Sequence, residues 1–284
     1  MYYIFYAFVR LLTLLPLRML YVVSDFLYII TYKLIGYRKQ TVRKNLSDSF
    51  PDKTSIELLK IEKKFYRYFC DLIIETIKQL NISDTSIKKL IQFTNSEYIY
   101  NDYKAGRSVF IMTSHYGNWE LCATGNLHLP DDKPLLNVYK TLKNANFDKF
   151  MLKLRGRYGG VNVDKNLLIR KLIELKRAGK IFSVGMISDQ SPRNDSNKIL
   201  QNFLGRETWF FSGTEILARK FAMPVYYAKI KRLKRGSYIC EIIPICTDSA
   251  LSHEGEITGK FAEILEQQIL DEPEYWLWTH NRWK

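Results

Sequence analysis

From residue 108 onward, short apolar runs of strand length alternate with amphipathic stretches whose apolar residues recur at helical spacing. The runs predict strands at 108–114, 134–139, 160–163 and 181–188, and the amphipathic stretches predict helices at 118–127, 147–159, 167–179, 214–223 and 256–270. Because parallel strands are joined by long crossovers, usually helices, this alternation favours an α/β fold. We expect a mostly parallel central sheet flanked by helices on both faces.

Two further elements follow from the same patterning. Residues 54–80 are predicted to form a long amphipathic helix, because apolar residues recur there at three- and four-residue steps. Thr54 and Glu57 have the spacing of a capping box at its start. Segments 224–233 and 237–245 predict a β-hairpin joined by a short turn that contains glycine.

The first 32 residues are rich in Tyr, Phe, Leu and Ile. Arg10, Arg18 and Asp25 leave no charge-free run of the about 20 residues that a simple spanning helix needs. On a helix, Arg18 and Asp25 fall nearly on one face and are expected to pair. We interpret the segment as a membrane anchor that lies in the interface or inserts obliquely. The alternative is a buried amphipathic helix of a soluble domain.

Charge is unevenly placed along the chain. The 284 residues carry 43 Lys and Arg against 29 Asp and Glu, for a net charge of +14, and residues 1–44 hold seven basic residues and one acid. We predict a membrane-anchoring segment at 1–45 and an α/β domain at 46–284. The surplus favours acidic partners: nucleic acid, anionic lipid or an acidic carrier protein.

Several kinds of site are not supported by the sequence. It contains no P-loop, no G-x-G-x-x-G after a strand, no G-x-S-x-G and no H-E-x-x-H, and its four histidines are scattered. The four cysteines form no C-x-x-C pair, so we expect free thiols in a reducing compartment. The N-terminus lacks the charged region and cleavage site of a secretory signal. We predict no metal and no cofactor.

The segment SHYGNWE, residues 114–120, carries the clearest chemistry. His115 follows the predicted strand 108–114, and the carboxyl ends of parallel strands are where open α/β sheets place ligands. Glu120 lies about one helical turn further on and is expected to orient the imidazole, whose other nitrogen could then take a proton from an alcohol. Asn118 is expected to cap the following helix. The alternative is a structural histidine.

SHYGNWE and several other segments of the chain together resemble the late acyltransferases of lipid A biosynthesis. These are the lauroyl and myristoyl transferases within the wider lysophospholipid acyltransferase group. SHYGNWE is similar to the catalytic block of that family. The other similar segments are VRKNLSDSFPDKT (42–54), LRGRYGG (154–160), SDQSPR (188–193), NFLGRETWFFSGTEILARKFAMPV (202–225) and PEYWLWTHNRWK (273–284).

The resemblance implies transfer of a fatty acyl chain from an acyl carrier protein thioester to a hydroxyl of a lipid A precursor, on a 3-hydroxyacyl chain. His115 would be the general base and Glu120 its orienting partner, with no covalent acyl-enzyme. The implied fold is like that of glycerol-phosphate acyltransferases. The implied location is the inner (cytoplasmic) membrane, with the active site facing the cytoplasm.

Further residues are expected at the substrates. Arg155 would stabilise the oxyanion or bind an acidic headgroup, unless it is only a surface helix charge. Asp189 and Gln190 are expected to face the same pocket from a neighbouring strand, unless they form a structural turn. Arg193 is a candidate phosphate contact or a solvated charge, and Lys140 stands where the family often has arginine, which has a bidentate fork that lysine lacks. The full set is Asn118, Lys140, Arg155, Asp189, Gln190 and Arg193.

Several alternatives stay open. The basic run 229–235 is either a docking patch for an acidic carrier or headgroup, or a solvated hairpin. Trp276, Trp278 and Trp283 pack in the core or touch the membrane interface. The expected partners are acyl carrier protein, a lipid A precursor and an anionic membrane, but no nucleic acid. Other hypotheses are another glycolipid or lysophospholipid acceptor, thioester hydrolysis, and a basic lipid- or nucleic-acid-binding protein without catalysis.

Overall fold

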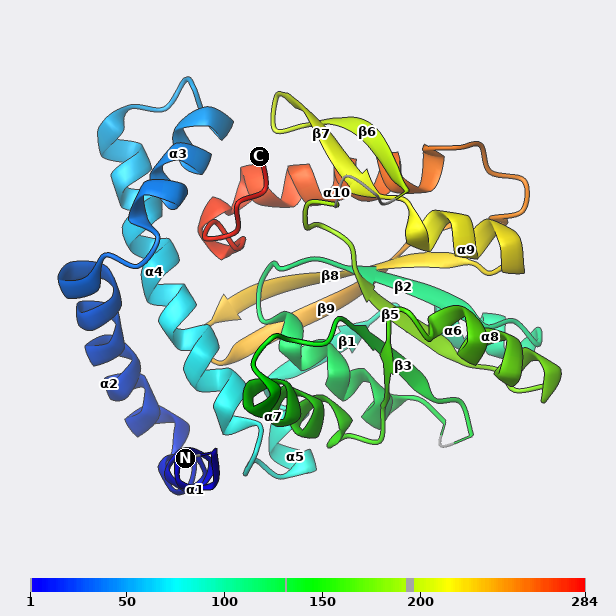
Figure 1. Ribbon diagram of the computed structural model, residues 1–284, viewed down its shortest axis with the longest axis horizontal. Helices are drawn as coiled ribbons and strands as arrows, with labels where there is room; N and C mark the ends of the chain where they lie inside the picture. The colour runs from blue at the N-terminus through cyan, green and yellow to red at the C-terminus, as the bar shows by residue number, and fades with distance from the viewer. Residues whose placement is uncertain (1, 131, 193–196, 284) are drawn as a thin grey trace.

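The computed structural model describes residues 2–130, 132–192 and 197–283. A seven-stranded sheet in the order β1-β9-β8-β2-β5-β3-β4 runs through it (Figure 1). All neighbouring strands in this sheet are parallel except β8 and β9, which form the predicted hairpin. The expected α/β fold is therefore confirmed. The strands are β1 (Ile91–Thr94), β2 (Val109–Thr113), β3 (Leu135–Tyr139), β4 (Val161–Asp164), β5 (Ser183–Ile187), β8 (Val225–Lys234) and β9 (Ser237–Cys246).

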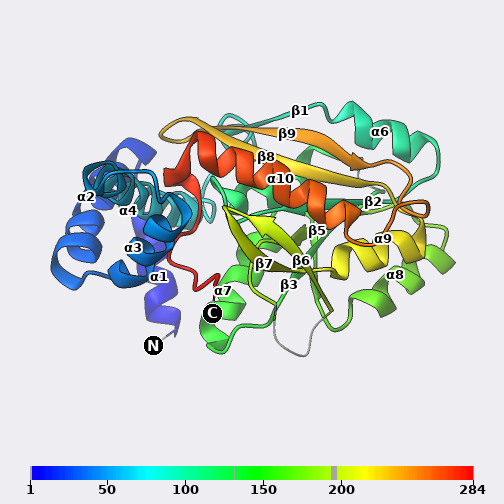
Figure 2. The ribbon, with the colours of Figure 1, turned by 90° about the horizontal axis from the view of Figure 1, so that it is seen from above.

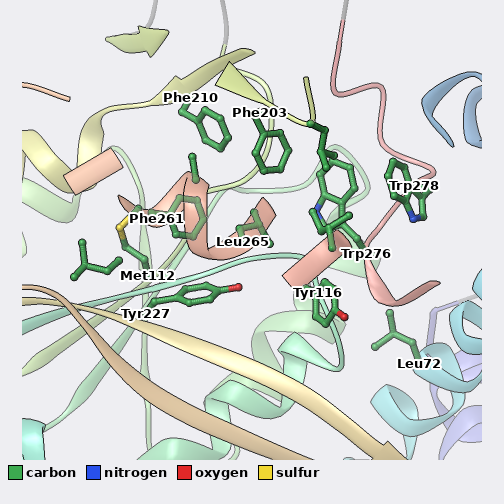
Figure 3. Close-up of a cluster of buried hydrophobic side chains, with 14 of the residues drawn as sticks. Leu72, Met112, Tyr116, Phe203, Phe210, Tyr227, Phe261, Leu265, Trp276 and Trp278 are labelled. Carbon is green, nitrogen blue, oxygen red and sulfur yellow. The ribbon is translucent and has the colours of Figure 1, made fainter. Parts of the chain in front are cut away.

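The sheet separates two hydrophobic cores. Tyr226 and Tyr227 are adjacent on β8, yet they belong to different clusters because successive strand side chains point to opposite faces. One face packs against α8 (Leu168–Arg177), α9 (Gly213–Phe221) and α10 (Glu256–Asp271), and the other against α5 (Asp84–Ile87), α6 (Glu97–Lys104) and η2 (Trp119–His128). Figure 3 shows part of the first core, in which Phe261 from α10 lies near Tyr227.

Most predicted helices are confirmed, with one change of type. Helix α4 (Ser55–Lys78) starts at the predicted capping box, and α7 (Ala145–Gly156) lies within the predicted segment 147–159 except for its first two residues. The segment predicted as helical at 118–127 is instead the 3₁₀ helix η2. A 3₁₀ helix rises about 2.0 Å per residue, so it spans a longer distance than an α-helix of the same length.

A small antiparallel hairpin lies apart from the main sheet, and the hydrophobic pattern did not predict it. It consists of β6 (Lys198–Phe203) and β7 (Arg206–Phe211). Its inward side chains Phe203 and Phe210 pack in the first core close to Trp276 (Figure 3). Trp276 and Trp278 are fully buried, so the core alternative holds for these two residues, and Trp283 packs against the same core.

The N-terminal helices gather at one end of the molecule, as Figures 1 and 2 both show. They are α1 (Tyr2–Leu12), α2 (Leu17–Tyr28), the π-helix η1 (Ile29–Ile35) and α3 (Lys39–Ser49). Helix α2 packs against α4 through its buried positions Leu20, Ser24 and Tyr28. Its opposite face and η1 leave large apolar side chains exposed, among them Met19, Val22, Phe26, Ile29, Ile30, Leu34 and Ile35.

Within the described residues, no single helix is long and apolar enough to cross a membrane. One pair of helical segments is together long and apolar enough to do so, by length and composition alone. The pair is Leu17–Ile35 and Lys39–Ser49, and the chain bends by 91° between them.

One sequence expectation about charges was wrong, and ion pairs account for part of a second. Asp25 does not pair with Arg18, which is exposed; its carboxylate lies 2.7 Å from the guanidinium of Arg235 on the β8–β9 turn. In the basic run 229–235, Arg232 and Arg235 both pair with Asp71 on α4, at 2.7 and 2.6 Å, and Arg235 remains exposed. A buried carboxylate needs a counter-ion, and the β8–β9 hairpin supplies two.

Candidate active site

His115 lies where predicted, directly after the carboxyl end of β2. Strand β5 pairs with β2 in parallel and ends at the same edge of the sheet, which brings Asp189 beside His115. The Asp189 Oδ1 atom is 2.7 Å from His115 Nδ1, and its Oδ2 accepts the backbone N–H of His115 at 2.9 Å. Oδ2 also accepts the indole N–H of Trp276 at 2.8 Å. The carboxylate therefore fixes both the ring and the backbone of His115.

This geometry assigns the tautomer of the imidazole. An ionised carboxylate only accepts hydrogen bonds, so Nδ1 carries the proton and Nε2 keeps its lone pair. The Gln190 side-chain amide nitrogen lies 3.0 Å from Nε2 and donates to it. Burial would raise the pKa of Asp189, but the adjacent His115 and the N–H donors outweigh burial and lower it. Asp189 therefore stays ionised beside the ring.

The expected pairing of Glu120 with His115 was wrong. Both Glu120 oxygens accept from Arg155 at the end of α7, at 2.8 Å from Nε and 2.6 Å from Nη2. Burial would raise the pKa of Glu120, but the Arg155 guanidinium outweighs it and lowers that pKa. The bidentate fork of arginine matches a carboxylate, so a buried Glu120 takes this partner. Arg155 is thus not the exposed helix charge of the alternative interpretation, since its side chain is only 23% exposed.

Trp119 connects these two pairs. Its indole N–H donates to Glu120 Oε1 at 3.1 Å, and its ring meets the His115 imidazole edge to face at 5.0 Å between centroids. Glu120 and Arg155 therefore lie next to the imidazole across one aromatic ring, although neither replaces Asp189 as its hydrogen-bond partner.

The loop between His115 and Trp119 is held by α4 and the C-terminal segment. Gly117 has φ +57, and a Cβ there would lie 2.7 Å from the Ile230 side chain, so only glycine fits. Its N–H donates to the Tyr275 carbonyl at 2.9 Å, and its carbonyl accepts the Tyr68 hydroxyl. This clamp fixes the backbone on which His115 stands.

Asn118 has a different role from the one expected. It makes no side-chain capping bond to η2. Instead it is fully buried, and its amide donates to Glu75 Oε2 on α4 at 2.8 Å. It therefore ties the start of η2 to α4 and is not exposed to a substrate.

The remaining predicted residues are less central. Lys140 is exposed just beyond the carboxyl end of β3, the strand next to β5, so it lies at the same edge of the sheet. Arg193 lies outside the described residues. Sequence reasoning missed the roles of Asp189 as the partner of His115 and of Trp276 as its support. The signal for Asp189 was present, because it directly follows a predicted strand parallel to the one before His115.

An apolar cavity adjoins this group of residues. It lies between η2 and the second face of the sheet, and Trp119, Glu120 and Arg155 are part of its wall. Strand residues such as Ile111, Ile187, Ala228 and Ile242 contribute apolar lining, and Phe93, His128 and Leu129 also line it. We call it the η2 cavity. It can take an apolar chain whose reactive end lies beside His115.

Comparison with known proteins gives one family over the whole chain. The model of the family described as bacterial lipid A biosynthesis acyltransferase matches residues 1–284. The chain is 22% identical over 291 aligned residues to the lipid A biosynthesis lauroyltransferase of Escherichia coli K12, covering 96% of this chain and 91% of that one. It is 21% identical to the palmitoleoyltransferase of the same organism, with 87% and 79% covered. A lipid A biosynthesis acyltransferase of Haemophilus influenzae is 23% identical, with 90% and 81% covered.

Proposed function

Because the chain belongs to the family of bacterial lipid A biosynthesis acyltransferases, whose reaction is acyl transfer to a lipid A precursor, we propose that His115 is the general base of this transfer. We further propose that the acyl donor is an acyl carrier protein thioester and the acceptor group a hydroxyl of the precursor. The observation that carries the mechanism is the Asp189–His115 pair, which leaves Nε2 unprotonated beside an apolar cavity.

The reaction follows from this tautomer. The acceptor hydroxyl takes the place of the Gln190 amide at Nε2 and gives its proton to that nitrogen as its oxygen attacks the thioester carbonyl. The tetrahedral intermediate collapses, its C–S bond breaks, and the departing sulfur takes the proton from the imidazolium. Asp189 stabilises the imidazolium in between, and no acyl-enzyme forms.

We assign to Arg155 the stabilisation of the negative charge on the thioester oxygen. Two of its nitrogens are bonded to Glu120, and the guanidinium keeps further N–H donors beside the η2 cavity. Glu120 holds that guanidinium in one orientation, so its role is to position Arg155. Preorganised donors of this kind are commonly the largest single contribution to acyl transfer.

We assign the η2 cavity to the acyl chain of the donor. Its strand and η2 side chains are largely apolar, and the wall formed by Trp119 and Glu120 adjoins His115. A chain inserted there leaves its thioester at that wall. Burying the chain favours binding by roughly 0.8 kcal/mol per methylene.

The apolar surface of α2 and η1 supports attachment to the inner membrane, with the active site facing the cytoplasm. Its exposed Phe26, Ile30, Leu34 and Ile35 suit the acyl boundary of a bilayer, and Lys33 lies among them. In this assignment residues 1–45 form the membrane-attached part and 46–284 the acyltransferase domain. The membrane is anionic, and no nucleic acid takes part.

The test compares purified wild-type protein with His115→Ala, using acyl carrier protein loaded with a labelled fatty acid and a lipid A precursor. We expect transfer by the wild type, and a loss of about 10²–10⁴-fold in the variant. Equal transfer by both proteins would rule out His115 as the base. Acyl-coenzyme A of the same chain length serves as the donor control. Equal rates from the two donors would contradict the carrier-protein assignment, and free fatty acid without acylated lipid would indicate a thioesterase.

A further inference from the structure

A second hollow approaches the same residues from the other side of Trp119. It is a groove between α4, α7 and the C-terminal segment, and we call it the α4–α7 groove. Ile73 and Thr76 from α4, Phe147 and Met151 from α7, and Leu277 from the C-terminal segment line it. Phe147 is 49% exposed, so this wall is open to solvent.

The groove and the η2 cavity meet at one pair of residues. Trp119 and Glu120 line both of them, and the His115 ring contacts Trp119. Acyl transfer to a lipid acceptor joins two apolar molecules at one base, and a single narrow cavity filled by the donor chain has no room for the acceptor. Two apolar hollows that converge on the wall beside the base satisfy this requirement.

The outer end of the groove adjoins the exposed apolar surface of the N-terminal helices. Tyr37 and Arg38, which follow η1 directly, line the groove, and Leu34 and Ile35 at the end of η1 are exposed. The groove therefore opens close to that exposed apolar surface. The exposed Arg38 donates from Nη1 to the Thr279 carbonyl at 2.9 Å, which places a cation at the entrance.

We propose that the α4–α7 groove binds a fatty acyl chain of the acceptor lipid and brings its hydroxyl to His115. This inference rests on the proposed function, because it assigns the second substrate of the same reaction. The occupant is an acyl chain of an anionic glycolipid. The groove is lined by apolar side chains where a chain must lie, and it carries a cation where an anionic headgroup would remain outside.

Photolabelling tests the site without requiring turnover. The probe is a lipid A precursor whose acyl chain ends in a diazirine, added to the full chain in detergent micelles. We expect the label on residues of α4 and α7 that line the groove, in the wild type and equally in His115→Ala. Labelling at Phe93 or Leu129 in the η2 cavity, or no labelling of the groove, would overturn the proposal. A wild type that labels in the groove but transfers nothing would overturn only the proposed function.

Kinetics on matched variants give a second measurement. Thr76→Trp fills the groove, and Phe147→Ala removes one wall at a half-exposed position. We expect each to raise KM for the acceptor, about tenfold or more for Thr76→Trp, with KM for the donor unchanged. Leu129→Trp fills the η2 cavity and is expected to raise KM for the donor instead.

The control is Leu251→Ala, which removes an apolar side chain that is 78% exposed and lies outside both hollows. It should change neither constant. If both Thr76→Trp and Phe147→Ala leave the acceptor KM at the wild-type value, the groove does not hold the acceptor chain.

Discussion

Two buried carboxylate clusters in this protein use similar residues for different ends. The site cluster joins Asp189 to His115 and Glu120 to Arg155. The α4 cluster joins Asp71 to Arg232 and Arg235, and Glu75 to Tyr21, Asn118 and Tyr238. In the α4 cluster the carboxylates are held by protein donors from separate elements. In the site cluster, the lone pair of His115 Nε2 is met by one side-chain amide, which a substrate can replace.

The pKa directions express the same difference. Asp189 and Glu120 are buried, but each has a close charged or chargeable partner, and the pKa of each is lowered. Glu75 is equally buried and is bonded to neutral donors, and burial outweighs those donors and Arg232 to raise its pKa. At Glu120 the Arg155 cation in direct contact therefore offsets the loss of water, whereas the neutral hydrogen bonds at Glu75 do so only in part.

The largest expected effect comes from separating the two carboxylates of the site cluster. Asp189→Asn keeps the shape but removes the charge that fixes the tautomer, so kcat should fall by about 10²–10⁴-fold. Glu120→Gln leaves the His115 partner in place and should cost less in kcat. It should instead destabilise the fold by about 3–5 kcal/mol, because Arg155 loses its buried counter-ion. Single-turnover rates and denaturant unfolding measure the two effects.

The opposite order of rate losses would identify Glu120 as the residue that orients the base. Gln190→Ala is the matched control, because it removes only the amide that the acceptor hydroxyl replaces. We expect it to preserve kcat far better than Asp189→Asn.

Only some features of the site cluster could be predicted from the sequence. The positions of His115 and Asp189 followed from the strand pattern, because two parallel strands were predicted to end just before them. The partner of Glu120 did not follow, because Arg155 lies 35 positions away and its approach depends on how α7 packs against η2. A five-residue spacing suggested His115 instead, but spacing along the chain does not specify the direction of a side chain on a 3₁₀ helix.

The α4 cluster could not be predicted from the local sequence pattern either, because its contacts also depend on how distant elements pack. Asp71 and Glu75 lie on the predicted amphipathic helix and are buried. The helical period of apolar residues does not predict that charged residues at these positions are buried. Their partners Arg232, Arg235 and Tyr238 come from a hairpin about 160 residues later, which only the tertiary fold brings close. The core helices and strands were predictable because their burial repeats at regular intervals.

The next effect is the loss of the bonds at Glu75. In Glu75→Gln an amide N–H₂ or a carbonyl oxygen replaces each carboxylate oxygen, so at least one of the donors Asn118, Tyr238 and Tyr21 faces another donor. We expect a loss of about 1–3 kcal/mol in stability and a smaller loss of activity, transmitted through Asn118. Tyr238→Phe removes one of these bonds and should cost less. Activity lost without any change in stability would contradict a supporting role.

A third prediction uses the opposite pKa directions. Asp189 has a lowered pKa in the folded protein, so between that value and its ordinary one the unfolded chain binds more protons. Its contribution to stability therefore rises with pH across this window and is lost on acidification. Glu75 has a raised pKa, so the folded protein binds more protons between the ordinary and the raised value, and its contribution falls as pH rises.

Denaturant unfolding at a series of pH values measures both contributions. Relative to the wild type, Asp189→Asn should lose most stability above the ordinary pKa of an aspartate. Glu75→Gln should compare more favourably with the wild type as pH rises above the ordinary pKa of a glutamate. Equal pH dependence in both variants would mean that the two clusters do not differ in the way described.

The smallest expected effect concerns the link between the α4 cluster and the N-terminal helices. The hydroxyl of Tyr21 on α2 donates to Glu75 Oε1 at 2.8 Å, and the amide of Asn118 donates to the other oxygen of the same carboxylate. Tyr21→Phe removes the first bond and leaves the second, so it should cost about 1 kcal/mol and leave kcat nearly unchanged in detergent. If kcat falls as far as in Glu75→Gln, then α2 controls the loop of His115 through Glu75, and the separation between the two clusters is not complete.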